Sequence, residues 1–305
     1  MTAPHPHFVC IGPKRSATTW LADQLKFHRD IWLTPIQELS YLSGGFASHH
    51  SKPYMTMRWT GWEMAKRVIR NKAPGILADR AFLQVARRLA AEDGFDLDGY
   101  RALFAPAGRR ISGDISPMYA SMTAEQIAQA LPVLESTCVY LLARDPVARF
   151  WSELSMHARK RSFGDVDYGS LAFARAFFDD PERQRQHILS GIVQRWREGI
   201  GAERLNILFF DDIVSQPEAS LRRIVDDIGA DWSKRLPAIS PTRNRKHGRA
   251  AVHAAPGVRG AVANWFADEL DRCADLFGPR VENWRADHRL DEHRGAPGPP
   301  EPATL

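Results

Sequence analysis

The sequence predicts an α/β protein in which a central parallel sheet is flanked by helices. Short apolar runs typical of strands alternate along the chain with amphipathic stretches typical of helices. The clearest run, Cys138–Ala143, is apolar throughout and is therefore expected to be a central strand, buried on both faces. The 305 residues are enough for one large domain of this class.

The elements follow from these patterns in chain order. The first strand is expected at Phe8–Ile11, and a helix with an apolar stripe at Trp20, Leu21 and Leu25 follows it. The remaining strands are expected at 31–34, 110–116, 138–143 and 205–210, and helices at 18–27, 62–70, 146–160, 184–198, 219–227 and 258–276. We expect a loop at Ser43–Met57, a single domain over residues 1–290, and a Pro-rich disordered tail at 291–305.

The composition narrows the class of protein. A formal net charge of +5 suits an anionic ligand, and no basic run with stacking aromatics indicates nucleic-acid binding. Three dispersed cysteines give neither a disulfide framework nor a zinc spacing. Residues 1–7 lack the layout of a signal peptide, and no apolar run has the length of a membrane span, so we expect a cytoplasmic protein. The Ala- and Arg-rich composition suggests a bacterial source.

An anion site is expected directly after the first strand. The segment GPKRSATTW, from Gly12 to Trp20, passes from a strand through a tight turn into a helix. Unpaired backbone N–H groups and the positive end of the helix dipole favour an anion at such a turn. The side chains expected to contribute are cations and hydroxyls, so the site residues are Lys14, Arg15, Ser16, Ala17, Thr18, Thr19 and Trp20.

This loop differs from the GxxxxGK[ST] loop of nucleoside triphosphatases. Counted from Gly12, Ala17 falls at the second glycine and Thr18 at the lysine, and only Thr19 fits. The cation lies instead within the loop, at Lys14, which suits a donor with a single 5′-phosphate and no triphosphate–metal complex. A Ser/Thr helix cap beside two surface cations is the simpler alternative.

A second phosphate motif follows the central strand. Arg144 stands at the end of that strand, where ligands bind in open α/β sheets. Asp145 and Pro146 have the residue types of a helix start, and Ser152 follows about two helical turns later. An arginine and a serine so placed can converge on one phosphate.

Together these two motifs resemble those of the sulfotransferases that use PAPS (3′-phosphoadenosine 5′-phosphosulfate). GPKRSATTWL is similar to the family's 5′-phosphosulfate loop, and RDPVARFWS to its 3′-phosphate motif R-D-P-x-x-R-x-x-S. The resemblance spans the chain up to about Trp284. It implies a P-loop nucleotide-kinase-like fold, PAPS as donor, PAP as product and no metal, with Arg144 and Ser152 on the 3′-phosphate. A looser match, TRNRKHGR, resembles the family's late basic loop and adds Lys246, His247, Gly248 and Arg249 as candidates.

The catalytic candidates come from the same resemblance. TPIQELSYL is similar to a stretch of the glycosaminoglycan-type sulfotransferases whose glutamate is the proposed base, which implies that role for Glu38. Gln37 replaces the family's lysine there. Lys14 is placed to help the phosphate leave. A surface glutamate at a helix start is the alternative for Glu38.

Candidates for acceptor binding are less specific. GDISPMY closes the third strand and resembles G-E-K-S/T-P-x-Y, which implies Asp114, Ser116 and Tyr119, although Asp114 stands for Glu and Ile115 for Lys. We add His49 and His157 as residues that would line the acceptor cleft. A strand that simply ends at Ser-Pro, and surface histidines, are the alternatives.

The function expected is transfer of a sulfuryl group from PAPS to a hydroxyl or amine by in-line displacement. Glu38 favours a saccharide or glycolipid acceptor, while a small phenolic, lipid or peptide acceptor stays open, and a homodimer is one oligomeric state that the sequence allows. A P-loop small-molecule kinase is the alternative, and it would need Mg²⁺ and a Gly-Lys-Ser/Thr triplet that this loop lacks. A scaffold that binds PAP without chemistry is a third alternative.

Overall fold

The computed structural model describes residues 5–44, 46, 76–91, 96–235 and 251–288. The chain forms two compact units, the first from Met1–Arg144 and Ile192–Gly248 and the second from Asp145–Gly191 and Arg249–Leu305. This division does not test whether either unit folds alone, so a single domain over 1–290 stays a prediction. The expected helix at 62–70, most of the loop at Ser43–Met57 and the tail at 291–305 lie outside the described residues.

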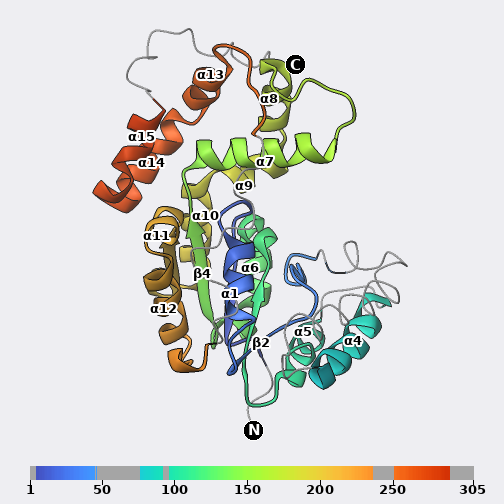
Figure 1. Cartoon of the computed structure of the whole chain (residues 1–305). Helices are drawn as coiled ribbons and strands as arrows, with labels where there is room; N and C mark the ends of the chain where they lie inside the picture. Colours follow the sequence, from blue (N-terminus) through green and yellow to red (C-terminus); the bar gives the residue numbers. More distant parts are fainter. Residues whose placement is uncertain (1–4, 45, 47–75, 92–95, 236–250, 289–305) are drawn as a thin grey trace. The chain divides into compact units, whose positions relative to one another are not determined.

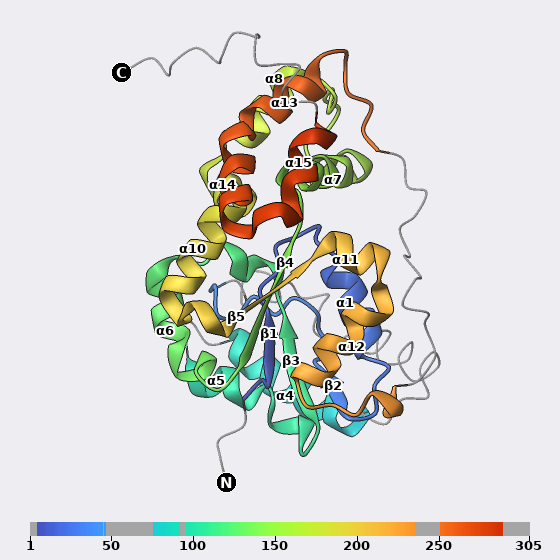
Figure 2. The same ribbon diagram turned by 90° about the vertical axis from the view of Figure 1, so that its left-hand side faces the viewer.

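The first unit is built on a parallel sheet of five strands in the order β2-β3-β1-β4-β5 (Figure 2). This confirms the predicted fold class. The bounds of the strands are within one residue of those predicted, because each apolar run ends where the backbone hydrogen bonds between strands end. The strands are β1 (Phe8–Cys10), β2 (Ile31–Leu33), β3 (Ile111–Ile115), β4 (Cys138–Ala143) and β5 (Leu205–Phe209).

Helices cover both faces of this sheet (Figure 2). Helices α1 (Thr18–Leu25), α11 (Phe210–Ser215) and α12 (Pro217–Asp227) lie on one side, where Leu21 and Leu221 join the buried core of the strands. Helices α6 (Ala124–Leu134) and α10 (Leu189–Ile200) lie on the other side. The other described elements of this unit before β4 are helices α4 (Ile76–Ala91) and α5 (Leu97–Ala102) and the short 3-10 turns η2 (Ala105–Ala107) and η3 (Pro117–Ser121).

The second unit is helical in the residues described (Figure 1). Its aromatic core gathers around Phe150, whose ring is 5.7 Å from that of Phe177 and 5.8 Å from that of Phe266. Both rings, like that of Phe150, are fully or almost fully buried. The helices are α7 (Pro146–Lys160), α8 (Leu171–Phe178), α9 (Pro181–His187), α13 (Val258–Trp265), α14 (Ala267–Phe277) and α15 (Glu282–Asp287), with the first residues of α10.

The predicted bounds of two helices were wrong, because each of these stretches forms two helices. The stretch 184–198 is divided at Ile188, whose ψ of 94° is extended, and the stretch 258–276 is divided at Phe266. A buried carboxylate explains the first division: Glu269 accepts hydrogen bonds from the backbone N–H of Ser190 at 2.7 Å and from its hydroxyl at 2.5 Å. Glu269 thus satisfies the start of α10 from another helix of the second unit.

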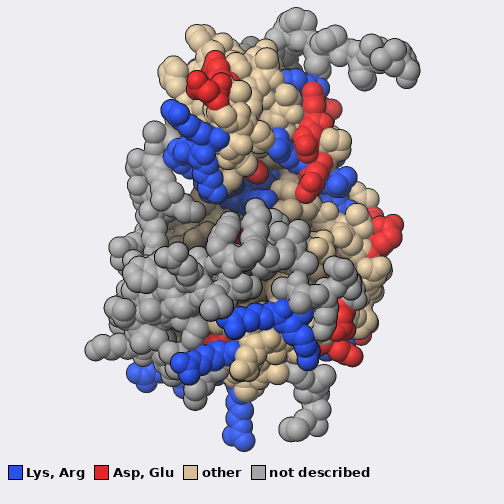
Figure 3. Space-filling model, turned by 90° about the vertical axis from the view of Figure 1, so that its right-hand side faces the viewer, with Lys and Arg blue, Asp and Glu red and all other residues tan. Residues whose placement is uncertain are grey.

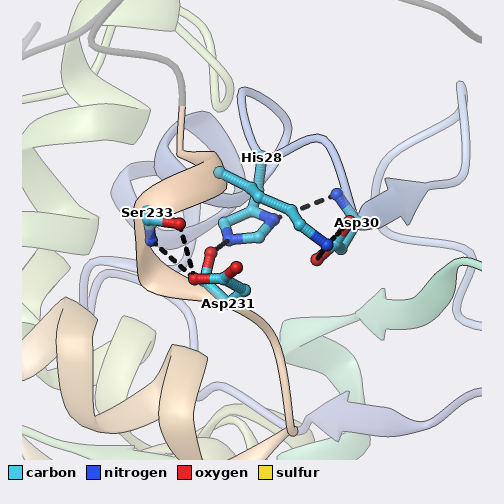
Figure 4. Close-up of polar contacts among 5 residues, drawn as sticks. His28, Asp30, Asp231 and Ser233 are labelled. Atoms are coloured by element: carbon cyan, nitrogen blue, oxygen red, sulfur yellow. Dashed lines mark hydrogen bonds and ion pairs between the residues drawn. The ribbon is translucent and has the colours of Figure 1, made fainter.

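A histidine joins the start of β2 to the turn after α12 (Figure 4). The Nε2 atom of His28 lies 2.9 Å from the carbonyl oxygen of Asp231, and its Nδ1 accepts the backbone N–H of Asp30 at 3.1 Å. Only the neutral ring makes both bonds. Lys234 adds an ion pair of 3.0 Å to Asp30. These contacts fix the 3-10 turn η5 (Trp232–Lys234) against the sheet.

Candidate active site

The loop after β1 is held closely by its neighbours. The N–H of Leu142 in β4 donates to the carbonyl of Gly12 at 2.8 Å, which continues the parallel ladder past the end of β1. Gly12 has a φ of 94°, and a Cβ there would lie 2.6 Å from the Cα of Pro117. A glycine is required here, because any side chain would meet the backbone of the neighbouring turn.

The start of α1 is arranged as an anion site. Arg15 and Ala17 have φ values of 66° and 72°, a left-handed conformation that costs about 1 kcal/mol for each non-glycine residue. Ala17, the N-cap residue, makes no side-chain cap hydrogen bond to the first N–H groups of the helix. The Ser16 side chain is fully buried, and its Oγ has no hydrogen-bond partner among the residues described. A phosphate group would supply acceptors for both.

The other residues of this loop differ in exposure. Lys14 and Arg15 are half-buried, Thr18 is buried and Thr19 is exposed. Trp20 is half-buried and packs against the core of the first unit. The two cations therefore reach the surface, while Thr18 and Trp20 anchor the helix.

The turn after β4 contacts this loop directly. Nη1 of Arg144 donates a hydrogen bond of 2.5 Å to the carbonyl oxygen of Arg15. The guanidinium carbon of Arg144 also lies 4.2 Å from the centre of the Phe210 ring, within cation–π range. Sequence reasoning missed Phe210, because it was assigned to the end of an apolar strand, and only the topology places α11 beside Arg144.

Ser152 belongs to the second unit, whereas Arg144 belongs to the first. Within its own unit, Ser152 lies on α7, whose bounds agree with those predicted. Asp145 caps this helix by accepting the N–H groups of Val147 and Ala148, and Pro146 occupies its first position. A joint phosphate site of Arg144 and Ser152 stays a prediction.

Glu38 lies in an irregular segment after β2, not at a helix start. Its side chain is exposed, and both Glu38 and Ser40 have positive φ values, 59° and 52°. Parallel strands end at the same edge of a sheet, so this segment, the loop after β1 and the turn of Arg144 all leave from that edge.

Asp114, Ser116 and Tyr119 are buried and contact one another. The Asp114 carboxylate, 1% exposed, accepts hydroxyl hydrogen bonds of 2.6 Å from Ser116 and Tyr119 and one of 2.9 Å from Tyr100. Burial raises the pKa of Asp114, and the three hydroxyl donors offset part of that increase. These side chains face the protein interior, so their predicted contact with an acceptor gains no support from this geometry.

Of the remaining candidates, one belongs to the second unit and the others lie outside the described residues. His157 lies on α7 in the second unit, with Nε2 3.8 Å from Oε1 of Glu153 and its ring 5.4 Å from that of Phe177. His49 and the late basic loop, Lys246, His247, Gly248 and Arg249, lie outside the described residues.

Within the described ranges, no group of three His, Cys, Asp or Glu side chains is arranged to hold a metal ion. No helix in those ranges has the length and apolar character to cross a bilayer. Lys and Arg side chains lie among acidic and uncharged ones on the face shown in Figure 3.

The fold and the loop after β1 define a P-loop-type α/β protein. Residues 6–234 match the sequence profile of the sulfotransferase family, and the chain belongs to that family. Its fold is similar to that of a sulfotransferase from Alicyclobacillus acidocaldarius, with 19% identity, a TM-score of 0.59, and coverage of 92% of this chain and 99% of that one. It is also similar to the sulfotransferase domain of the Synechococcus PCC 7002 olefin synthase, with 16% identity, a TM-score of 0.51, and coverage of 97% and 98%. A comparison with curated protein sequences gives no match.

Proposed function

We propose that this sulfotransferase uses PAPS as its donor and transfers the sulfuryl group to an acceptor hydroxyl or amine, releasing PAP. The observation that carries the proposal is the buried Ser16 hydroxyl, which lacks a partner among the described residues and lies at the uncapped start of α1. A 5′-phosphate would complete the hydrogen bonds of both. The contact between Arg144 and Arg15 places a second cation beside the same loop.

Each residue has a task in this proposal. Lys14 stabilises the charge that develops on the leaving phosphate, and the N–H groups at the start of α1 bind its oxygens. Arg144, with Ser152 and the late loop of Lys246 and Arg249, binds the 3′-phosphate. Glu38 takes the proton of the acceptor as the sulfur–oxygen or sulfur–nitrogen bond forms and the bond from sulfur to the phosphate oxygen breaks.

The support for Glu38 as the base is positional. Its segment leaves the same sheet edge as the phosphate loop, and its exposed side chain is accessible to an acceptor. The irregular backbone there disfavours the alternative of an ordinary helix start. We extend the proposal to a saccharide or glycolipid acceptor in the cytoplasm, with phenolic, lipid and peptide acceptors to be compared in the same assay.

The kinase alternative receives no specific support from the geometry. Thr18 occupies the position of the P-loop lysine, and its side chain is buried at the start of α1. A triphosphate–Mg²⁺ complex would lack its usual cation at that point.

Binding of nucleotides separates the two functions. PAP should raise the melting temperature of the protein, because a ligand that binds only the folded state stabilises it, and adenosine 5′-phosphate should raise it much less. Equal shifts would contradict a 3′-phosphate site. Turnover of PAPS across acceptor panels, compared with turnover of ATP and Mg²⁺, then tests the chemistry. Greater turnover with ATP would overturn the proposal in favour of a kinase.

A further inference from the structure

Asp114 organises a buried hydrogen-bond network at the edge of the sheet from which the phosphate loop leaves. Its carboxylate accepts from Ser116, Tyr119 and Tyr100, and all four residues are at most 1% exposed. Two of these hydroxyls make a second contact. The Ser116 hydroxyl accepts the backbone N–H of Ser40 at 3.0 Å, and the Tyr119 hydroxyl accepts that of Leu42 at 3.3 Å.

The direction of these bonds follows from the number of protons. A hydroxyl has one proton to donate, and an ionised carboxylate only accepts. Because Ser116 and Tyr119 give their protons to Asp114, their lone pairs are left to accept the N–H groups of Ser40 and Leu42. The carboxylate thus sets the orientation of two hydroxyls that also accept hydrogen bonds from the backbone of residues 38–42 (the Glu38 segment).

The segment that receives these bonds needs external support. Glu38 and Ser40 have φ values of 59° and 52°, which are unfavourable for residues other than glycine. Such a conformation persists when surrounding contacts determine it. The contacts to Ser116 and Tyr119 begin two residues after Glu38 and bracket Tyr41.

The turn that carries Ser116 and Tyr119 also holds the phosphate loop. The N–H of Ser116 donates to the carbonyl of Cys10 at 3.0 Å, and that of Ala120 donates to the carbonyl of Ile11 at 2.9 Å. Pro117 of the same turn lies against Gly12. One short turn therefore contacts both the donor side and the acceptor side of the proposed site.

From these contacts we propose that Asp114 is a positioning residue, which fixes the backbone of the Glu38 segment relative to the phosphate loop through the hydroxyls of Ser116 and Tyr119. This role rests on the proposed function for Glu38, and the residues that perform it are at most 1% exposed. The sequence predicted direct acceptor contacts for Asp114, Ser116 and Tyr119, whereas the role proposed for Asp114 is indirect.

Tyr100 supplies a matched control. Tyr100→Phe and Tyr119→Phe each remove one hydroxyl donor from Asp114 and keep the ring, but only the Tyr119 hydroxyl also accepts a bond from the Glu38 segment. Ser116→Ala likewise removes the hydroxyl that accepts the hydrogen bond of the Ser40 amide. Hydrogen exchange of the Leu42 amide should increase about tenfold in Tyr119→Phe, and that of the Ser40 amide should increase about tenfold in Ser116→Ala. Neither amide should change in Tyr100→Phe.

Activity gives the second measurement. In Tyr119→Phe and Ser116→Ala, kcat at saturating PAPS should fall about tenfold or more, since misplacement of a base affects the transition state, while the Kd for PAP should stay within about twofold. Tyr100→Phe should keep a kcat within about threefold of the wild type at a similar melting temperature. A further variant, Asp114→Asn, puts an amide donor against either Ser116 or the two tyrosines, and it should increase exchange at Ser40 or at Leu42 even if kcat cannot be measured.

The outcomes distinguish this inference from the proposed function. Unchanged exchange at both Ser40 and Leu42 in Tyr119→Phe, Ser116→Ala and Asp114→Asn would overturn the positioning role, whatever the activity. Equal losses of kcat in Tyr100→Phe and Tyr119→Phe would overturn it too, because they would reflect stability alone. If no sulfuryl transfer is found, the exchange measurements still decide whether Asp114 fixes the segment, while failure to bind PAP counts against the proposed function only.

Discussion

The guanidinium of Arg144 donates a hydrogen bond of 2.5 Å to the carbonyl oxygen of Arg15. The two residues are 129 positions apart and belong to the turns that leave the neighbouring strands β4 and β1. The bond joins the two motifs on which the donor assignment depends. Because one edge of the sheet provides both turns, a single nucleotide is a suitable ligand for the pair.

Replacement of Arg144 tests this pairing. Arg144→Gln should weaken binding of PAP by about 1.5–3 kcal/mol, the usual range for a charge-assisted hydrogen bond, as measured by isothermal titration calorimetry. Arg223→Gln is the control, because Arg223 is an exposed arginine of the same unit, 3.9 Å from Asp227. A Kd for PAP equal to that of the wild type would rule Arg144 out as a phosphate ligand.

Replacement of Ser16 should weaken the binding of PAP without lowering the stability of the free protein. Its buried hydroxyl lacks a partner among the described residues, so Ser16→Ala should leave the melting temperature of the free protein equal or higher. The same change should reduce the increase that PAP produces, because one phosphate contact is lost. Thermal unfolding with and without PAP checks both signs. A lower melting temperature without ligand, and an undiminished PAP shift, would indicate a purely structural serine.

Lys14 should affect the chemical step. In Lys14→Ala, kcat should fall about 10²–10³-fold, the range for loss of one group that stabilises developing charge, with little change in the acceptor KM. Steady-state kinetics at saturating PAPS measure both constants. Lys160→Ala, at the exposed end of α7, is the control. A higher KM with an unchanged kcat would instead make Lys14 a residue of substrate binding.

Alanine substitutions at Gly12 and Gly229 should distinguish the cost of a steric conflict from the cost of backbone strain. Both have positive φ values, 94° and 75°, but a Cβ at Gly229 has no heavy atom within 4 Å, whereas one at Gly12 lies 2.6 Å from the Cα of Pro117. Gly229→Ala should cost about 1 kcal/mol and Gly12→Ala about 3 kcal/mol in the free energy of unfolding, measured by urea denaturation. Equal costs would show that the turn of Pro117 moves aside freely.

His28 should make stability depend on pH. Burial is the largest cause that lowers its pKa below 6.5, and the contacts to Asp231 and Asp30 oppose this, with Lys234 adding a small decrease. The unfolded chain therefore binds the proton more readily. The stabilising contribution should be complete above pH 6.5 and should be lost as the pH falls toward the folded pKa, with a slope of at most about 1.4 kcal/mol per pH unit.

Comparison with His28→Gln isolates this contribution. An amide at that position can donate to the Asp231 carbonyl and does not titrate, so the free energy of unfolding should vary less between pH 5 and 7 than in the wild type. His7, whose pKa burial also lowers, remains in both proteins and contributes to the residual dependence. Identical pH profiles would exclude the neutral state of His28 that its two contacts, drawn in Figure 4, require.

The sequence by itself determined those strands and helix starts that depend on residues adjacent in the chain. The apolar run Cys138–Ala143 gave a strand with the predicted bounds, and Asp145 with Pro146 gave the first residue of α7. The passage from β1 through Gly12 into α1 was likewise predictable, because a strand, a glycine turn and a helix start are encoded by neighbouring residues.

Only the tertiary structure decided those features that depend on residues far apart in the sequence. The division of the predicted helix at Ile188 depends on Glu269 at the start of α10, and no periodicity in that stretch contains this information. Asp114 was predicted to face an acceptor, but the fold buries it between Tyr100 and Tyr119. A sequence shows which groups can ionise or donate, whereas their partners and their solvation depend on which chain segments the fold brings together.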